Sequence, residues 1–317
     1  MILLGREVKI NIARAAEGIF LSFVFLFLIG ISFFIINWFF VENKLFENYF
    51  FQKNLKASVS NIQTDSQIKA IKRQQEILDL DAKSIFSLEV GFEQENILFK
   101  KNENEKLPIA SLVKLMTVLL VLEKYDLSEK VTISQEAMAQ EGEQGVLKLG
   151  ETLSVKNLLY ITLIESGNRA AKALSEVMGT DKFVALMNNR AKNLGLLNSY
   201  FRDPTGLDSE NYSTAKDLFK LSKYLFENYS LFREIVGLKE FDLYLDDDQF
   251  HHKLTNTNKL LGEVESVVGG KTGWTDIAKG CVMAIQESKD KKNYIIHIIL
   301  GSEDRFKEAK KLISFVN

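Results

Sequence analysis

The residues of this sequence best suited to chemistry are a serine and a lysine three positions apart, Ser111 and Lys114. They lie between Ile109 and Leu122, where 11 of 14 residues are apolar, so the pattern predicts a helix that is buried nearly all round. Ser111, Lys114 and Thr117 recur at a spacing of three and would form one polar stripe on that helix. A buried lysine tends to lose its proton, and a neutral amine beside a hydroxyl can act as the base that makes the hydroxyl nucleophilic.

The spacing alone does not decide between catalysis and an ordinary structural role. The pattern S-x-x-K occurs four times in the chain, and only the copy at Ser111 falls in an apolar helical segment. Ser111 could instead cap that helix, and the Lys114 side chain could extend to the surface. Catalysis therefore requires partners elsewhere in the sequence.

A second pair of polar residues lies at a junction between two predicted helices. Ser166-Gly167-Asn168 follows the apolar stretch 158–164 and precedes a helical pattern from Arg169 to Met178. A hydroxyl and an amide at such a junction can project into a cleft, although the same residue types also cap ordinary helices.

A second lysine stands in a segment with strand character. Lys271-Thr272-Gly273 comes at the end of a predicted strand that begins near Ser266, and Gly269-Gly270 precedes it. Glycines on both sides of the lysine would let the backbone approach a ligand closely. By itself the motif is equally consistent with a plain strand end.

Taken in this order, the three motifs resemble the active-site triplet of the penicillin-recognising serine enzymes. The sequence is most similar to the D-alanyl-D-alanine carboxypeptidase family, the low-molecular-weight penicillin-binding proteins. The resemblance covers about residues 81–317 and is carried by four segments, 107–117, 203–207, 255–261 and 269–275.

The resemblance implies a role for each helical motif. Ser111 would attack the carbonyl of the penultimate D-alanine in a peptidoglycan stem peptide, with Lys114 as its base. Ser166 would relay a proton to the leaving amine, and Asn168 would hold Lys114 and the substrate backbone.

The strand motif would bind the substrate. Lys271 and Thr272 suit its terminal carboxylate, and Gly273 belongs to the same substrate-binding motif. The backbone N–H groups of Ser111 and Trp274 would hold the oxyanion. No metal or organic cofactor is required, and β-lactams are the expected covalent inhibitors.

Three other functions share part of this pattern. A D,D-endopeptidase that cuts D-alanyl cross-links carries the same motifs. A β-lactamase of the commonest class would add an E-x-x-L-N segment, and the sequence between Asn168 and Lys271 contains none. A non-catalytic module that binds wall fragments would not need every reactive group, whereas this chain retains all of them.

Hydrophobic periodicity predicts the elements that must position these motifs. The predicted order is a hairpin of strands 84–90 and 97–100, a helical block over about 109–235, strands 266–271, 280–286 and 294–300, and a last helix over about 303–315. This order favours an α+β domain in which one mostly antiparallel sheet is flanked by helices, with a helical subdomain. The resemblance implies the β-lactamase/transpeptidase-like form of that fold.

An uncharged run of 24 residues, from Gly18 to Val41, precedes the domain. At about 1.5 Å per residue it would span about 36 Å, which is long enough for a transmembrane helix. No small-residue cleavage motif follows it, which favours a retained anchor over a cleaved signal peptide. The expected organisation is a short cytoplasmic segment (1–17), a transmembrane helix (18–41), a linker (42–80) and the serine D,D-peptidase domain (81–317).

Lysine and arginine are balanced on the two sides of this run, so the positive-inside rule does not orient it. The resemblance supplies the orientation, because a cell-wall substrate requires the catalytic domain to lie outside. We therefore expect a single-pass protein of a bacterial cell membrane with an extracytoplasmic domain.

Composition excludes several other classes of protein. With 46% hydrophobic residues, one cysteine and a net charge of −2, the chain is neither disordered nor disulfide-rich, and nucleic acid is not an expected partner. Only three histidines are present, which argues against a histidine-based metal centre. His251 and His252 are expected in a solvated loop, Cys281 in the core, and Asp203 in a loop near the site.

Overall fold

The computed structural model describes residues 78–91, 95–142, 146–245, 248–289 and 291–316, all within one compact unit, residues 68–317. The expected transmembrane helix at 18–41, the segment 1–17 and nearly all of the linker lie outside the described residues. Within the described ranges, no helix combines the length and apolarity needed to cross a bilayer.

A five-stranded antiparallel sheet forms one layer of the domain. Its strands are β1 (Ser84–Val90), β2 (Glu95–Lys101), β9 (Val267–Thr275), β10 (Lys279–Glu287) and β11 (Tyr294–Ser302), in the order β2-β1-β11-β10-β9. The predicted hairpin, the three later strands and their shared antiparallel sheet are confirmed. The prediction that β9 ends at the lysine motif is wrong, because the strand continues through that motif to Thr275.

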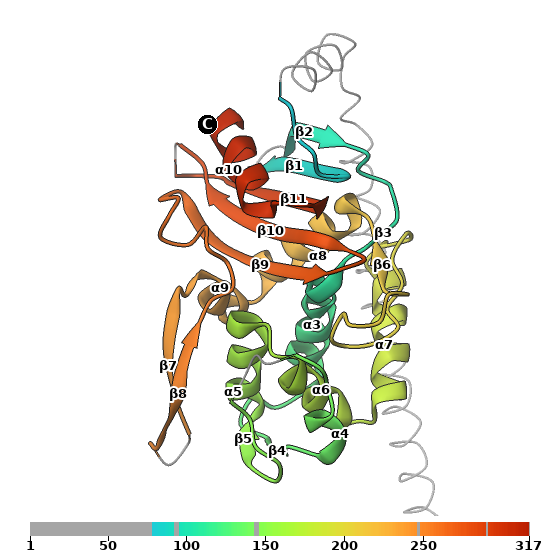
Figure 1. Cartoon of the computed structure of the whole chain (residues 1–317), viewed down its shortest axis with the longest axis vertical. Coiled ribbons are helices and arrows are strands. Elements are labelled where there is room, and N and C mark those ends of the chain that lie inside the picture. The colour runs from blue at the N-terminus through green and yellow to red at the C-terminus, as the bar shows by residue number, and fades with distance from the viewer. Residues whose placement is uncertain (1–77, 92–94, 143–145, 246–247, 290, 317) are drawn as a thin grey trace, which may run out of the picture. The chain divides into compact units, whose positions relative to one another are not determined.

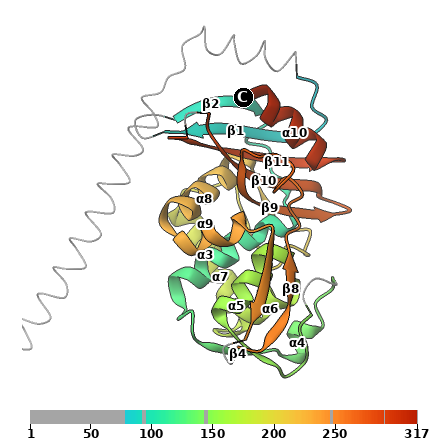
Figure 2. The ribbon, with the colours of Figure 1, turned by 90° about the vertical axis from the view of Figure 1, so that its left-hand side faces the viewer.

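Both faces of the sheet are covered, and for this reason the middle of β10 is buried throughout. Helix α10 (Arg305–Val316) packs on one face, where Leu312 and Ile313 join Val282 and Ile299 in a small core. Helix α8 (Ala215–Asn228) packs on the other face, with the ring of Phe219 at 5.3 Å from that of Phe86. Figures 1 and 2 show the two helices on opposite sides of the strands.

A helical layer lies on the α8 side of the sheet, and its centre is α3 (Lys114–Lys124), which the short 3₁₀ turn η1 (Ala110–Val113) precedes. Seven residues in a row, Leu115–Val121, are buried in this helix, as the apolar pattern predicts. Around it lie α4 (Gln135–Met138), α5 (Val155–Tyr160), the π-helical turn η2 (Ile161–Glu165), α6 (Asn168–Glu176), α7 (Thr180–Asn193) and α9 (Ser230–Gly237).

Three two-stranded ladders join the helical segments. They are β3 (Leu107–Pro108) with β6 (Tyr212–Ser213), β4 (Lys130–Thr132) with β5 (Thr152–Ser154), and β7 (Glu240–Tyr244) with β8 (Phe250–Thr255). The sequence pattern did not predict them. The strands of the first two ladders have two or three residues, which is too short to show alternation, and a bulge interrupts the longer β7–β8 ladder. The α+β class is nonetheless confirmed.

The prediction of a solvated loop at His251 and His252 is wrong. Both residues lie in β8, and their side chains are only 9% and 11% exposed. The polar sequence around them suggests solvent, but carboxylates of Glu151 and Glu165 satisfy the rings inside the domain. The core position expected for Cys281 is confirmed, since its side chain is fully buried in β10.

Candidate active site

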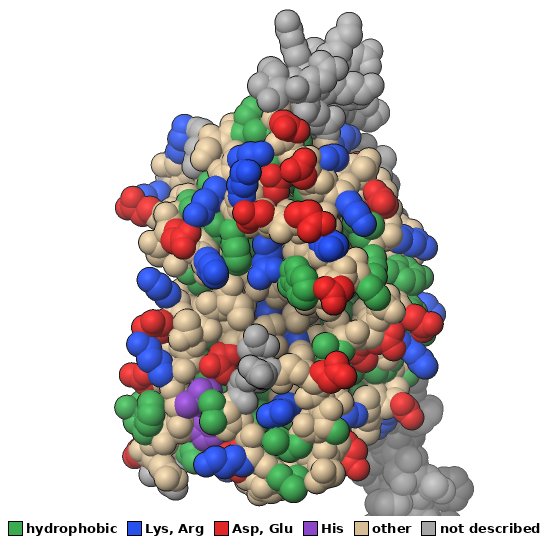
Figure 3. Space-filling model, in the orientation of Figure 1, with side chains coloured by type: hydrophobic (Ala, Val, Ile, Leu, Met, Phe, Trp, Pro, Cys, Tyr) green, Lys and Arg blue, Asp and Glu red, His purple; other side chains and the backbone are tan. Residues whose placement is uncertain are grey.

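The fold brings the three motifs to one place, where the start of α3, the η2–α6 junction and β9 meet. Lys114 Nζ donates to Ser111 Oγ at 3.0 Å and to Asn168 Oδ1 at 2.7 Å. Lys271 Nζ donates to Ser166 Oγ at 2.7 Å. The face shown in Figure 3 is hollowed near its middle, and Lys or Arg atoms are visible within the hollow.

Ser111 lies inside the turn η1 and does not cap the helix. The capping residue of η1 is Ile109, with no side-chain cap, so the structural alternative for Ser111 is excluded. Ala110, immediately before the serine, has a left-handed backbone with φ of 48°. Such a conformation costs a non-glycine residue on the order of 1–3 kcal/mol and persists only where the surroundings impose it.

Two glycines lie in close contact with the backbone beside Ser111. A Cβ at Gly273 of β9 would lie 2.7 Å from Ser111 N, and a Cβ at Gly206 would lie 2.1 Å from Ala110 O. The absent side chains therefore allow β9 and the 203–211 loop to approach the turn from two sides. This contact is the structural reason for glycine in the Lys271-Thr272-Gly273 motif.

Lys114 is fully buried and makes a third hydrogen bond, to the backbone oxygen of Thr205 at 2.6 Å. Burial lowers the pKa of Lys114 to about 7, because desolvation penalises the ammonium more than the nearby Asp203 carboxylate stabilises it. Its amine therefore exchanges protons near neutral pH, 3.0 Å from a hydroxyl. The alternative in which the Lys114 side chain extends to the surface is therefore excluded.

Lys271 is a second buried amine. Its pKa is well below the ordinary value, first because of burial and then because of the neighbouring charges of Lys114 and Arg305. Beside it, Thr272 Oγ1 donates to Thr257 Oγ1 at 2.8 Å. Thr257 belongs to the segment 255–261 that the sequence analysis singled out.

Arg305 is a site residue that sequence reasoning missed. It lies at the start of α10, half-buried, and donates from Nη1 to Gly273 O at 3.3 Å. No motif marks it, since it is 32 residues beyond that glycine and reaches the site only through the packing of α10 on the sheet. Its guanidinium adds positive charge beside the two buried amines, which suits an anionic ligand.

Ser166 has a strained backbone, as Ala110 has. It ends η2 in the left-handed conformation with φ of 64°, and Gly167 N donates to Ile161 O at 3.1 Å to close the turn. A Cβ at Gly167 would lie 2.7 Å from Ile161 Cγ2, so glycine is needed at this position. Asn168 Nδ2 donates to Glu141 O at 2.7 Å, which leaves its Oδ1 directed at Lys114.

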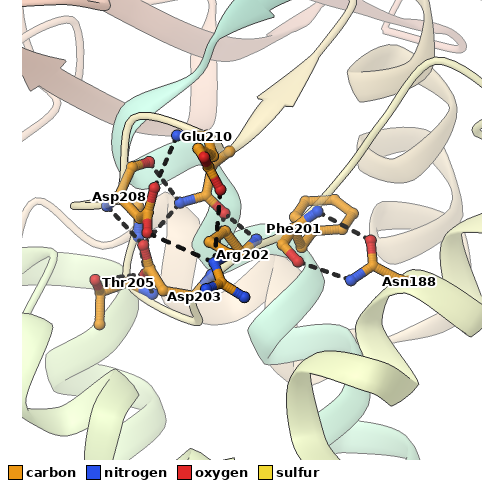
Figure 4. Close-up of polar contacts among 9 residues, drawn as sticks. Asn188, Phe201, Arg202, Asp203, Thr205, Asp208 and Glu210 are labelled. Atoms are coloured by element: carbon orange, nitrogen blue, oxygen red, sulfur yellow. Dashed lines mark hydrogen bonds and ion pairs between the residues drawn. The ribbon is translucent and has the colours of Figure 1, made fainter. Parts of the chain in front are cut away.

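The loop 203–211 is held by Asp203, whose function could not be derived from sequence. Its carboxylate accepts from Thr205 N, Thr205 Oγ1, Gly206 N, Asp208 N and Asn211 Nδ2 (Figure 4). Burial alone would raise the pKa of Asp203, but these hydrogen bonds outweigh it and lower the pKa. The ionised carboxylate thus fixes the Thr205 carbonyl that Lys114 contacts.

The two aromatic residues considered for the cleft differ in their surroundings. Tyr160 is packed: its ring stacks on Phe241 with centroids 4.4 Å apart, and its hydroxyl donates to Glu234. Trp274 is 55% exposed on β9, which is the edge strand of the sheet. An edge strand offers free backbone groups to an extended ligand.

The described residues contain no group of three or more His, Cys, Asp or Glu arranged to hold a metal ion. The reactive groups of the hollow are amines, hydroxyls and an amide. This set suits acyl transfer by a serine nucleophile.

The model of the D-alanyl-D-alanine carboxypeptidase family, peptidase S11, matches residues 70–304. The chain belongs to this family. Curated members include the D-alanyl-D-alanine carboxypeptidase DacF of Bacillus subtilis, which is 36% identical over 230 residues, or 69% of this chain and 58% of DacF. A D-alanyl-D-alanine endopeptidase of Pseudomonas aeruginosa is 31% identical and is covered over 71% of its length.

Solved structures of S11-like proteins share the fold. The DD-transpeptidase of Streptomyces K15 superposes with a TM-score of 0.69 at 27% identity, covering 75% of this chain and 97% of that one. Penicillin-binding protein D2 of Listeria monocytogenes, in its ampicillin-bound form, gives a TM-score of 0.63 at 32% identity and covers 75% and 98%. The expected transpeptidase-like fold is thus confirmed.

The close approach at Gly206 can be tested by comparison with Gly179. Both glycines have a left-handed φ, +90° and +88°, but a Cβ meets nothing within 4 Å at Gly179. We expect Gly179→Ala to lower the free energy of unfolding by about 1–2 kcal/mol, the backbone cost alone. Gly206→Ala should lose about 1–3 kcal/mol more, because its Cβ overlaps the Ala110 carbonyl. Denaturant unfolding measures both, and equal losses would contradict the close approach.

Proposed function

We propose that this protein is a serine D,D-carboxypeptidase that removes the terminal D-alanine from peptidoglycan stem peptides. The observation that carries the proposal is the pair Ser111 and Lys114: a hydroxyl 3.0 Å from a buried amine with a pKa of about 7. A general base works best when its pKa lies near the working pH. Membership in the S11 family and the similarity to DacF support the choice of substrate.

In the proposed reaction, Ser111 Oγ bonds to the carbonyl carbon of the penultimate D-alanine while its proton passes to Lys114 Nζ. Backbone N–H groups of Ser111 and Trp274 stabilise the oxyanion. The C–N bond then breaks, and the leaving amine takes a proton through Ser166, which Lys271 contacts at 2.7 Å. Water hydrolyses the resulting ester and restores the serine.

The substrate would bind along the edge of β9. An extended peptide can add to an edge strand through its backbone, and the carboxylate of the terminal D-alanine would lie near Lys271, Thr272 and Arg305. Asn168 would contact the peptide backbone while it holds Lys114. No step requires a metal or an organic cofactor.

A D,D-endopeptidase is the second candidate. This chain matches 71% of the length of a D-alanyl-D-alanine endopeptidase from Pseudomonas aeruginosa and 75% of the length of one from Escherichia coli. Its match to DacF covers 58% of the length of DacF. Both activities break the same bond, and they differ in whether the leaving amine belongs to free D-alanine or to a cross-linked chain.

We further propose that residues 18–41 anchor the protein in the bacterial cell membrane, with the catalytic domain outside. The support is the uncharged 24-residue run together with an external substrate. The full chain should remain in the membrane fraction through an alkaline wash, and intact cells should label with a penicillin that does not cross membranes. A full chain recovered in the soluble fraction would contradict the anchor.

The activity is tested with Ser111→Ala. The full-length wild type should release D-alanine from a pentapeptide and form a stable adduct with a fluorescent penicillin, and Ser111→Ala should do neither, because the attacking oxygen is absent. Ser209→Ala is the matched control, since Ser209 is exposed and begins a second S-x-N pattern outside the site.

The same enzyme given a cross-linked dimer distinguishes the two candidates. Faster cleavage of the dimer than of the pentapeptide would favour the endopeptidase. A Ser111→Ala variant that still labels would remove Ser111 as the nucleophile.

The acylation rate should depend on pH through Lys114. Below its pKa of about 7 the amine is protonated and cannot accept the proton of Ser111, so the rate should fall about tenfold per pH unit on that side and level off above it. Asp203→Asn removes the charge that raises this pKa, so the pH at which the acylation rate begins to fall should be lower. Glu210→Gln, at an exposed residue of the same loop, should leave that pH unchanged. Stopped-flow labelling with penicillin measures the rates, and a flat profile between about pH 5 and 8 would exclude Lys114 as the base.

A further inference from the structure

A cluster of two histidines and two glutamates lies beside the site and has no part in the reaction proposed above. His251 Nε2 is 3.2 Å from Glu151 Oε2, and His252 Nε2 is 3.2 Å from Glu165 Oε2. The two rings also meet each other, with their Nδ1 atoms 2.5 Å apart. All four side chains are at most 20% exposed.

A β-bulge explains how two consecutive residues of one strand share a face. In the β7–β8 ladder Leu243 pairs with His252, but Tyr244 pairs with Phe250, so His251 is the extra residue. A bulge interrupts the alternation of side chains and re-aims one of them. Both rings therefore turn toward the helical layer, where the two carboxylates lie.

The two carboxylates belong to segments outside the β7–β8 hairpin. Glu151 precedes β5, and Glu165 ends η2. On β7 the charged residues are Glu240 and Asp242, and Glu240 is already paired with Lys253 of β8 at 2.6 Å. The histidine pair thus faces two carboxylates that no lysine or arginine neutralises among the described ion pairs.

Glu165 connects this cluster to the reactive hydroxyl. It is the residue immediately before Ser166, whose backbone is left-handed. The strained turn is fixed by Gly167 N donating to Ile161 O and by Thr257 N donating to Ile164 O at 3.0 Å. The contact from His252 to Glu165 is a side-chain restraint on the same turn, in addition to the contact from Lys271 to Ser166 Oγ.

We infer that His252 is a positioning residue for Ser166, acting through Glu165. The inference rests on the proposed function, since Ser166 is the hydroxyl that serves the leaving amine. Loss of the contact from His252 would loosen the turn that holds Ser166. Acylation would then respond to a group that touches neither substrate nor nucleophile.

The test compares two replacements of His252 in the full-length protein. Glutamine keeps an N–H donor near the position of Nε2, and phenylalanine keeps the ring without a donor. His252→Gln should acylate nearly as fast as wild type at neutral pH, and His252→Phe should be slower by about 10- to 100-fold, because a small displacement of a reacting group is costly. Glu240→Gln, which breaks the exposed ion pair of the same hairpin, should not change the rate.

These variants distinguish positioning from packing. If His252 only fills space, phenylalanine will serve as well as glutamine, and equal rates for the two would overturn the inference. Failure of the wild type itself to acylate would instead refute the proposed function.

Discussion

Two buried lysine amines, Lys114 and Lys271, are the constraint on which the rest of this structure depends. Moving an ammonium out of water costs on the order of several kcal/mol, even after the protein relaxes. The pKa values of both residues are lowered for this reason, and oxygens from distant segments surround them. Asn168 and Thr205 supply oxygens to Lys114, and Ser166 supplies one to Lys271. These oxygens belong to segments that are distant in sequence from the lysine that each one contacts. The hydrogen bonds to the amines therefore constrain the positions of the helical layer and the sheet relative to each other.

Two residues at the site have a strained backbone that the surrounding packing maintains. Ala110 and Ser166 both have left-handed backbones that alanine and serine disfavour. Gly206 and Gly273 let neighbouring backbone pack against the turn at Ala110 at distances that a side chain would prevent, and Gly167 packs closely against the Ile161 side chain. Strain of this kind persists only under close packing. The packing of the large core around α3 therefore offsets the energetic cost of the strained backbone at the site.

Local sequence signals drew attention to the two lysines but did not decide their role. The apolar run around Lys114 is long enough to predict burial, whereas the strand segment at Lys271 is by itself equally consistent with a plain strand end. The three motifs could be joined only through family resemblance, since no periodicity indicates that residues 105 positions apart, such as Ser166 and Lys271, meet.

The residues that support the site were not predictable in the same way. Asp203 contacts Lys114 only through the fold of its own loop, and Arg305 reaches Gly273 only because α10 packs on the sheet. The polar sequence around His251 suggested a solvated loop, and the bulge that turns this residue inward leaves no compositional signal. Long-range packing, which a single sequence does not encode locally, determines all three.

In the proposed reaction the two amines have different roles, and the electrostatic interaction between them favours a different protonation state for each. A base must be neutral, whereas a group that binds a carboxylate must be charged. The charge of Lys114 lowers the pKa of Lys271, so two ammonium groups together are disfavoured in this hollow. A substrate that ends in a carboxylate, as the proposed function requires, would stabilise the ammonium of Lys271, and repulsion from that charge would then favour the neutral form of Lys114. On this argument, binding of the correct substrate itself prepares the base beside Ser111.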